Sequence, residues 1–412
     1  MSTTVEQHES HEMQHGPWRE VPAPRNKPVN TAVAKWLFRH AFGQLPLRVE
    51  LADGLVMGSG DPDAPVMRIL DEPAFFQRLG ADGQIGFGES FMVGEWDADD
   101  PPAVLEPLAA RLATLAPAWM RRLRRISRQP VPSQNENTLT GARRNIEQHY
   151  DLSNDLFALF LDESMTYSSA LFAPGDTIDL AQMRKVDRIL GAVGVGPGTR
   201  LLEIGTGWGA LAIRAAQRGA QVTTLTLSRA QQALARQRVA SAGLNDRVDI
   251  QLRDYRDAQG TYDAVVSVEM IEAVGERYWP DYFVALDRLV APGGKVGLQA
   301  IVLDHDRLAA TRGQLTWISK YIFPGGALPS SRLIGEHVRD HTTLHISERF
   351  AFGASYAQTL RCWRERFDAH AEQVEALGFD RTFRRMWDLY FSYAEAGFVT
   401  GYLDVEQVVL SR

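Results

Sequence analysis

Short apolar runs alternate with amphipathic stretches along the second half of the chain. The apolar runs predict buried strands, and the stretches between them, such as 229–242, have the 3.6-residue period of helices. Strands that alternate with helices predict an α/β fold, a doubly wound and mostly parallel sheet that binds ligands at the carboxyl ends of its strands. The predicted strands are Arg200–Ile204, Gln221–Leu227, Val248–Leu252, Tyr262–Val268 and Lys295–Ile301.

Residues 31–135 show a different pattern. Segments 45–51 and 66–70 alternate apolar and polar residues as half-buried strands do, and a glycine-rich, aromatic stretch follows at 83–96. The pattern predicts a smaller N-terminal α+β domain. Its expected core includes Phe87, Phe91 and Trp96. A second interpretation is that this aromatic module holds an acyl chain or a lipid surface, or serves in dimer formation.

Two polar segments mark the ends of this N-terminal domain. Residues 1–30 have no apolar period, which predicts a disordered tail. The tail contains His8, His11 and His15, but with no ordered partner in view we predict no metal site. The proline-marked stretch 130–137 predicts a linker, so that a second domain spans 136–412.

A basic helix is predicted to precede the linker. Residues 105–128 have a helical pattern, and the second half places arginines among apolar residues. Such a helix can lie on an anionic membrane, where each basic residue contributes about 1 kcal/mol. A solvated helix face or a hinge explains the pattern equally well. The residues expected at the membrane are Trp119, Arg121, Arg122, Arg124 and Arg125.

Composition narrows the functional classes. The chain has 412 residues and a net charge of −7, which argues against general nucleic-acid binding. No apolar run is long enough to span a membrane and no signal sequence is visible, so we expect a cytoplasmic protein. The single cysteine, Cys362, excludes an internal disulfide and a cysteine-built metal site.

The turn that follows the predicted strand 200–204 gives the clearest indication of a ligand site. Gly205, Gly207 and Gly209 alternate over five residues after Glu203, just before a predicted helix. Glycines let the backbone approach a ligand, and the helix offers free N–H groups. The loop therefore suits a nucleoside cofactor. The dinucleotide fingerprint has a wider second gap, whereas this turn is similar to the first motif of class I methyltransferases that use S-adenosylmethionine (SAM).

Six motifs in order extend this similarity. They are 149–155 (HYDLSND), 167–170 (YSSA), 205–209 (GTGWG), 225–231 (LTLSRAQ), 320–324 (KYIFP) and 395–398 (EAGF). Over about residues 140–412 the chain resembles the cyclopropane-fatty-acyl-phospholipid synthase family. The 86–97 segment resembles the N-terminal domain of the bacterial members. The resemblance implies a Rossmann-like class I methyltransferase domain.

The resemblance also implies a set of cofactor contacts. Thr226 ends the second strand where many nucleotide folds place an acidic residue, and hydroxyl and amide groups can bind a ribose as well. Asp254 and Tyr255 are expected near the adenine. The full set expected to bind SAM is Tyr167, Ser168, Gly205, Gly207, Gly209, Thr226, Leu227, Gln231, Asp254 and Tyr255.

The family moves the SAM methyl group onto a cis double bond of a phospholipid acyl chain. A bound bicarbonate then removes a proton, and Glu272, the Ile301 backbone and Tyr356 match its binding residues. Ser169 stands where a cysteine is typical and Gln299 where a histidine is typical. Gln299 cannot carry a charge or a proton at neutral pH, which puts bicarbonate in doubt. Glu147, close to the expected site residue His149, is a candidate to anchor or replace the base.

These departures bear on the product. Proton loss directly after methyl transfer closes a cyclopropane ring, whereas a preceding hydride shift gives a methylene branch, which some family members form and which a separate reductase can saturate. We favour the methylene product, with the ring as the alternative. The resemblance further implies a homodimer and peripheral attachment to the inner face of the membrane. Two other readings are a methyltransferase of a soluble small molecule and a non-catalytic lipid-binding protein.

Overall fold

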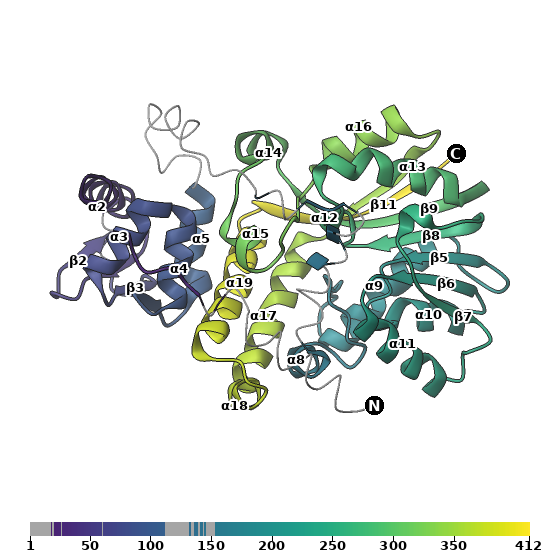
Figure 1. Ribbon diagram of the computed structural model, residues 1–412, viewed down its shortest axis with the longest axis horizontal. Coiled ribbons are helices and arrows are strands. Elements are labelled where there is room, and N and C mark those ends of the chain that lie inside the picture. Colours follow the sequence, from purple (N-terminus) through teal and green to yellow (C-terminus); the bar gives the residue numbers. More distant parts are fainter. Residues whose placement is uncertain are drawn as a thin grey trace. The chain divides into compact units, whose positions relative to one another are not determined.

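The computed structural model describes residues 18, 20–25, 27–59, 61–111, 132, 136–138, 141, 142, 144, 145 and 153–412. Contacts within the chain divide it into two units (Figure 1). Unit 1 consists of Met1–Pro130, Gly313–Ile322 and Trp363–Tyr402, and unit 2 consists of Val131–Arg312, Phe323–Cys362 and Leu403–Arg412.

A seven-stranded sheet forms the centre of unit 2. Its order is β10-β11-β9-β8-β5-β6-β7. The five strands from β9 to β7 run parallel, and β11 and β10 add an antiparallel edge. The strands are β5 (Arg200–Ile204), β6 (Gln221–Thr226), β7 (Val248–Leu252), β8 (Tyr262–Val268), β9 (Val290–Leu303), β10 (His345–Ala351) and β11 (Leu403–Ser411). The predicted α/β class with a mostly parallel sheet is confirmed.

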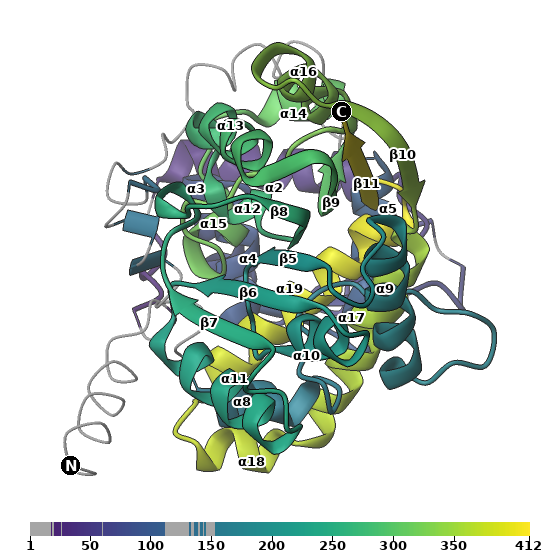
Figure 2. The same ribbon diagram turned by 90° about the vertical axis from the view of Figure 1, so that its right-hand side faces the viewer.

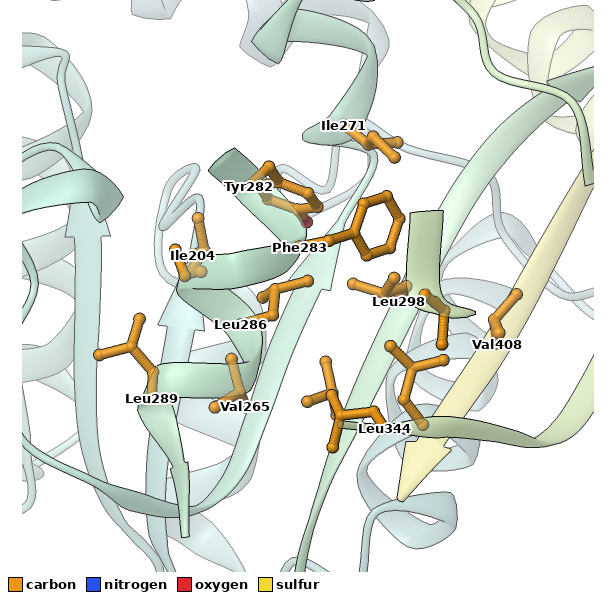
Figure 3. Close-up of a cluster of buried hydrophobic side chains, with 14 of the residues drawn as sticks. Ile204, Val265, Ile271, Tyr282, Phe283, Leu286, Leu289, Leu298, Leu344 and Val408 are labelled. Atoms are coloured by element: carbon orange, nitrogen blue, oxygen red, sulfur yellow. The ribbon is translucent and has the colours of Figure 1, made fainter. Parts of the chain in front are cut away.

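Helices cover both faces of this sheet (Figure 2). On one face α9 (Ile178–Ala192), α10 (Ala210–Gln217) and α11 (Arg229–Ser241) bury a cluster of small and branched side chains. On the other face α13 (Trp279–Leu289) and α16 (Ser331–His341) pack against the sheet. Figure 3 shows Phe283 and Leu286 of α13 directed at Leu298 and Val265 of the sheet. The two layers hold the strand ends at fixed positions.

Short helices and turns complete unit 2. They are α8 (Asn154–Phe160), η2 (Tyr255–Asp257), α12 (Ile271–Val274), η3 (Glu276–Tyr278), α14 (His305–Thr311) and the first part of α17 (Gly353–Ala369). Several of these elements directly follow a strand, so their residues lie at the carboxyl edge of the sheet, where ligands bind in folds of this type.

Unit 1 contains a four-stranded sheet in the order β2-β1-β3-β4. Its strands are β1 (Arg48–Glu50), β2 (Val56–Gly58), β3 (Val66–Ile69) and β4 (Trp96–Ala98). Among the described residues of unit 1, the helices are α2 (Pro28–Phe42), α3 (Glu72–Asp82), α4 (Gln84–Met92), α5 (Pro101–Arg111), α15 (Trp317–Tyr321), the last part of α17, α18 (Ala371–Ala376) and α19 (Arg381–Val399). Phe91 and Trp96 are fully buried and Phe87 packs on Trp96 with ring centroids 4.8 Å apart, as expected of core residues.

Within unit 1 the chain departs from the predicted domain organisation. Trp18, in the segment expected to be a tail, is buried and its ring lies 4.8 Å from that of Phe383. Helix α2 starts at Pro28, and the segments 313–322 and 363–402 belong to unit 1 although they follow residue 136. Glycine at position 88 permits this packing, because a Cβ there would come within 2.4 Å of the Trp317 ring. These associations join distant segments, so no local pattern could predict them.

Candidate active site

A pocket lies at the carboxyl ends of three neighbouring parallel strands of unit 2. Its walls include the residues that follow β5, β6 and β8, together with the segment 165–168 and part of η2. This is the position at which open α/β sheets bind their ligands.

The turn after β5 is shaped by its glycines. Gly205, Gly207 and Gly209 have φ of +98°, +51° and +90°, in the region that favours glycine. A Cβ on Gly205 would also lie 2.6 Å from Cγ and Sδ of Met270. Gly209 is the N-cap of α10, so the first N–H groups of that helix follow directly after the turn. The backbone can therefore approach a ligand closely.

Nine of the ten residues expected to bind the cofactor line this pocket. They are Tyr167, Ser168, Gly205, Gly207, Thr226, Leu227, Gln231, Asp254 and Tyr255. Gly209 is absent from the lining and serves as the helix cap instead.

Two polar groups of this lining are held in place by short hydrogen bonds. The Thr226 hydroxyl at the end of β6 donates to Gln231 Oε1 at 2.9 Å. Asp254 accepts two hydrogen bonds from the guanidinium of Arg256, at 2.8 and 2.6 Å. The pocket thus combines a close backbone turn with fixed hydroxyl, amide and carboxylate groups, a set that fits a nucleoside with an amino-acid tail.

Lys185 of α9 is a buried residue in the lining of this pocket. Its Nζ donates to Ser168 Oγ at 2.6 Å, and the side chain is 1% exposed. Burial lowers the pKa of Lys185 to about 8, against the opposing effects of Glu269, Asp162 and Glu203. Burial likewise raises the pKa of Glu203 to about 8, although Thr224 donates to its carboxylate at 2.6 Å.

A carboxylate directly after β8 collects three hydrogen bonds. Glu269 Oε1 accepts from the Ser169 backbone N–H at 2.9 Å and from Gln299 Nε2 at 2.8 Å, and Glu269 Oε2 accepts from the Tyr356 hydroxyl at 2.7 Å. We call Ser169, Glu269, Gln299 and Tyr356 the Glu269 cluster. The pKa of Glu269 is raised by burial, and the three donors and the charge of Lys185 oppose this increase in part. Glu269 is also one of the residues that line the pocket.

Gln299 is oriented by a second amide. Gln407 Nε2 donates to Gln299 Oε1 at 3.0 Å, which leaves the Gln299 amide nitrogen directed at Glu269. The predicted departure from histidine therefore retains a hydrogen-bond donor but no titratable group.

Glu272 and Ile301 form a separate contact beside this cluster. Glu272 Oε1 accepts from the Ile301 N–H at 2.6 Å. Within the described part of the chain, Glu272 Oε2 is buried without a hydrogen-bond partner. Burial, followed by the charge of Glu269, raises the pKa of Glu272 to about 8.

Several predicted site residues lie outside the described residues. They are Glu147 and His149, and the expected membrane residues Trp119, Arg121, Arg122, Arg124 and Arg125. Their roles remain predictions. Among the described residues, no helix combines the length and the apolar character needed to cross a bilayer.

Sequence reasoning missed Glu269 and Lys185. Glu269 had a usable signal, because it is a charged residue at the end of the apolar strand 262–268, on the ligand-binding edge. Lys185 lies in an amphipathic helix among other charged residues, so its burial has no local signal.

The fold and the pocket together define a class I SAM-dependent methyltransferase. The family model for mycolic acid cyclopropane synthetase matches residues 137–408, and the chain belongs to this family.

Named relatives agree with this assignment. Tuberculostearic acid methyltransferase UfaA1 of Mycobacterium tuberculosis is 51% identical over 401 residues, which cover 95% of this chain and 94% of the relative. Cyclopropane-fatty-acyl-phospholipid synthase of Escherichia coli K12 is 35% identical over 354 residues, covering 85% and 88%. The mycolic acid cyclopropane synthase CmaA1, solved with S-adenosylhomocysteine (SAH) and CTAB, superimposes with a TM-score of 0.61 at 31% identity, covering 66% of this chain and 98% of that one.

Proposed function

We propose that the protein methylates a cis double bond in an unsaturated acyl chain of a membrane phospholipid and releases a methylene-branched chain. The observation that carries the proposal is the 51% identity, over 95% of the chain, with a relative named a methyltransferase of tuberculostearic acid. The E. coli relative, whose name specifies a fatty-acyl phospholipid, supports the substrate class.

The chemistry places clear demands on the pocket. SAM, when bound, supplies a methyl group on a positively charged sulfur. The alkene is a weak nucleophile, so the glycine turn and the pocket walls must hold the double bond in line with that methyl group and exclude water. The acyl chain then carries a positive charge next to the methylated carbon, and a base must take up a proton.

The position and timing of the base decide the product. If the hydrogen on the methylated carbon first shifts to its neighbour, the charge moves to the more substituted carbon. Loss of a proton from the new methyl group then leaves a methylene branch, whereas loss without the shift closes a ring. The cyclopropane product is the second candidate, because the E. coli relative is named a cyclopropane synthase.

Mass spectrometry of fatty acids tests the proposal. A host that expresses this chain and is fed labelled methionine and oleate should accumulate acyl chains with one extra labelled carbon and a retained alkene. Chemical derivatisation separates this product from a ring, which would favour the second candidate. A labelled soluble metabolite without any labelled lipid would contradict the proposal.

We also propose that the helix expected around residues 119–125 attaches the protein to anionic membrane surfaces on their cytoplasmic side. Reversal of Arg121, Arg122, Arg124 and Arg125 to Glu should abolish co-sedimentation with anionic phospholipid vesicles. Reversal of Arg332 and Arg339, two exposed arginines of α16, is the control. Binding that survives the first set of changes would exclude this attachment.

A homodimer and a partner reductase that saturates the methylene group remain further proposals from the family resemblance. Light scattering of the purified protein checks the first. Co-expression with candidate reductases, followed by the loss of the alkene, checks the second.

A further inference from the structure

The site expected to bind bicarbonate is filled by the chain itself. The family resemblance assigns five groups to that anion, at Ser169, Glu272, Gln299, Ile301 and Tyr356. Three of them donate to the Glu269 carboxylate, at 2.7 to 2.9 Å, and the remaining two bond to each other. A carboxylate carries the same charge and the same planar pair of oxygens as bicarbonate, so both cannot use these donors at once. The residues present do not fit bicarbonate.

We propose that the Glu269 carboxylate is the general base of this enzyme and takes the place of a bound bicarbonate. The inference rests on the proposed function for the identity of the substrate, and it concerns the proton that leaves the methylated acyl chain.

The proton balance of the step is simple. A lone pair of the Glu269 carboxylate takes a proton from the new methyl group of the positively charged acyl chain. The electron pair of the broken C–H bond becomes the second bond of the methylene group, or the closing bond of a ring. Glu269 becomes a neutral carboxylic acid and returns its proton to water after the product leaves. No other reactant is needed.

The backbone supports a functional position for Glu269. Its φ is +51°, which is uncommon for a residue other than glycine, and its N–H donates to Gln299 O at 2.8 Å. Strained backbone of this kind persists where the surroundings fix it, and it gathers at functional sites. Here the backbone directs the Glu269 side chain from the end of β8 toward Ser169, Gln299 and Tyr356.

Glu272, the carboxylate that the family resemblance assigns to the bicarbonate site, is less suited to the role. Its carboxylate accepts from the backbone N–H groups of Ile301 and of Glu272 itself, and Glu272 is absent from the pocket lining. Glu269 accepts three hydrogen bonds and is a lining residue of the pocket. Like charges in close proximity cannot both ionise easily, so the carboxylate with more donors keeps the charge.

Bicarbonate dependence tests the inference with the unmodified full-length chain. Turnover on dioleoyl phospholipid vesicles, followed as SAH formation, is measured in buffer stripped of carbon dioxide and again with added bicarbonate. We expect equal rates. A wild-type enzyme that requires bicarbonate would overturn the proposal.

Two variants of Glu269 separate catalysis from structure. Glu269→Gln keeps the shape but cannot accept a proton, so turnover should fall by about 100-fold or more. Asp263→Asn is the matched control, because Asp263 lies at the opposite end of the same strand, paired with Arg200. Calorimetry of SAM binding and thermal unfolding verify that the Gln variant is intact. An intact Gln variant with wild-type turnover would overturn the proposal.

Glu269→Gly provides a readout apart from activity. It removes the carboxylate, relieves the positive φ and frees three donors, so it should bind bicarbonate and regain turnover when bicarbonate is added. Binding is observed as broadening of the 13C-bicarbonate NMR signal by the Gly variant and not by the wild type. If the wild type broadens the 13C-bicarbonate signal, and a Glu269→Gly variant that still binds SAM broadens it no further, the proposal is overturned.

The proposed function can fail independently of this inference. If the wild type forms a cyclopropane ring without bicarbonate, the product assignment fails and the role of Glu269 stands. If the wild type does not act on phospholipid, the substrate assignment fails, and the NMR comparison of wild type with Glu269→Gly still decides whether Glu269 fills the anion site.

Discussion

The glycine turn after β5 and the Glu269 cluster after β8 lie at the ends of adjacent strands of one sheet, yet they are built in opposite ways. The turn is a single segment whose function depends on backbone shape, with positive φ at Gly205, Gly207 and Gly209. The cluster joins the backbone N–H of Ser169 with side chains of β9 and α17 around the Glu269 carboxylate, which follows β8. We expect the turn to bind SAM through close approach of its backbone, and we expect the cluster to set the charge of Glu269.

This difference determines how each region responds to mutation. A change in the turn acts by steric clash and should affect cofactor binding and turnover together. A change in the cluster alters the charge or the pKa of Glu269, so it should affect turnover and its pH dependence while SAM still binds. Variants of the two regions should therefore separate the loss of SAM binding from the shift of the pH–rate profile.

The largest effect is expected for Gly205→Ala. The φ of +98° is unfavourable for alanine, and the new Cβ would lie 2.6 Å from Met270. Strained backbone costs about 1–3 kcal/mol, and the clash adds to it, so SAM binding should weaken by about 100-fold. Calorimetric titration with SAM measures this change in affinity. Gly293→Ala is the control, since Gly293 has φ of +78° but no neighbour within 4 Å. Equal SAM affinity of Gly205→Ala and wild type would contradict the steric account.

Lys185→Met should have the next largest effect, because Lys185 acts on both regions. Its charge lowers the pKa of Glu269, and its Nζ donates to Ser168 in the cofactor pocket. A base works as its carboxylate, so raising the pKa of Glu269 shifts the acid limb of the pH–rate profile to higher pH. We expect turnover at pH 7 to fall by about tenfold or more.

The pH–rate profile from pH 5 to 9 checks the Lys185 prediction. Lys295→Met, which changes an exposed lysine on the same sheet, should leave the profile unchanged. Loss of a buried charge partner also destabilises the fold by about 3–5 kcal/mol, so thermal unfolding is measured in parallel. A lower rate with an unshifted acid limb would show that Lys185 does not act through Glu269.

Tyr356→Phe should have a smaller effect of the same sign. The change removes the hydroxyl that donates to Glu269 Oε2 at 2.7 Å and leaves the ring in place. Hydrogen bonds to charged groups contribute about 1.5–3 kcal/mol, and two other donors remain, so turnover should fall by about tenfold. The acid limb should move to higher pH by less than in Lys185→Met. Tyr262→Phe, at the opposite end of β8, serves as the control. If Tyr356→Phe lost SAM affinity in proportion to turnover, the cluster would affect cofactor binding as the glycine turn does, which would contradict the separate roles of the two regions.

The same contrast explains what could be predicted from the sequence. The five strands and the glycine turn are local patterns, and their predicted bounds agree with β5 to β9 apart from the ends of β6 and β9. Of the candidate site, nine of the residues that line the pocket followed from the motifs. The antiparallel strands β10 and β11 and the Glu269 cluster depend on contacts such as Ser169 with Glu269, 100 positions apart, which no local period encodes.

Ser169 and Gln299, which replace the cysteine and the histidine typical of the family, contribute to the Glu269 cluster in different ways. Gln299 contributes a side-chain donor to Glu269, so its amide matters to the charge. Ser169 contributes its backbone N–H, while its hydroxyl donates to the Ala170 carbonyl at 3.0 Å. A cysteine or a serine at this position therefore offers the same backbone donor to the carboxylate.

Ser169→Ala should accordingly have the smallest effect. The variant keeps the N–H that donates to Glu269 and loses a neutral hydrogen bond, worth about 1 kcal/mol, within its own segment. Because this loss affects folding and leaves the charge of Glu269 unaltered, turnover should stay within about threefold of wild type, with an unshifted pH–rate profile. Gln299→Leu, which removes a side-chain donor from the same carboxylate oxygen, is the paired variant and should shift the acid limb to higher pH. If Ser169→Ala moved the profile as far as Gln299→Leu, the hydroxyl would take part in the anion site, and the cluster would depend on side-chain identity at all four of its positions.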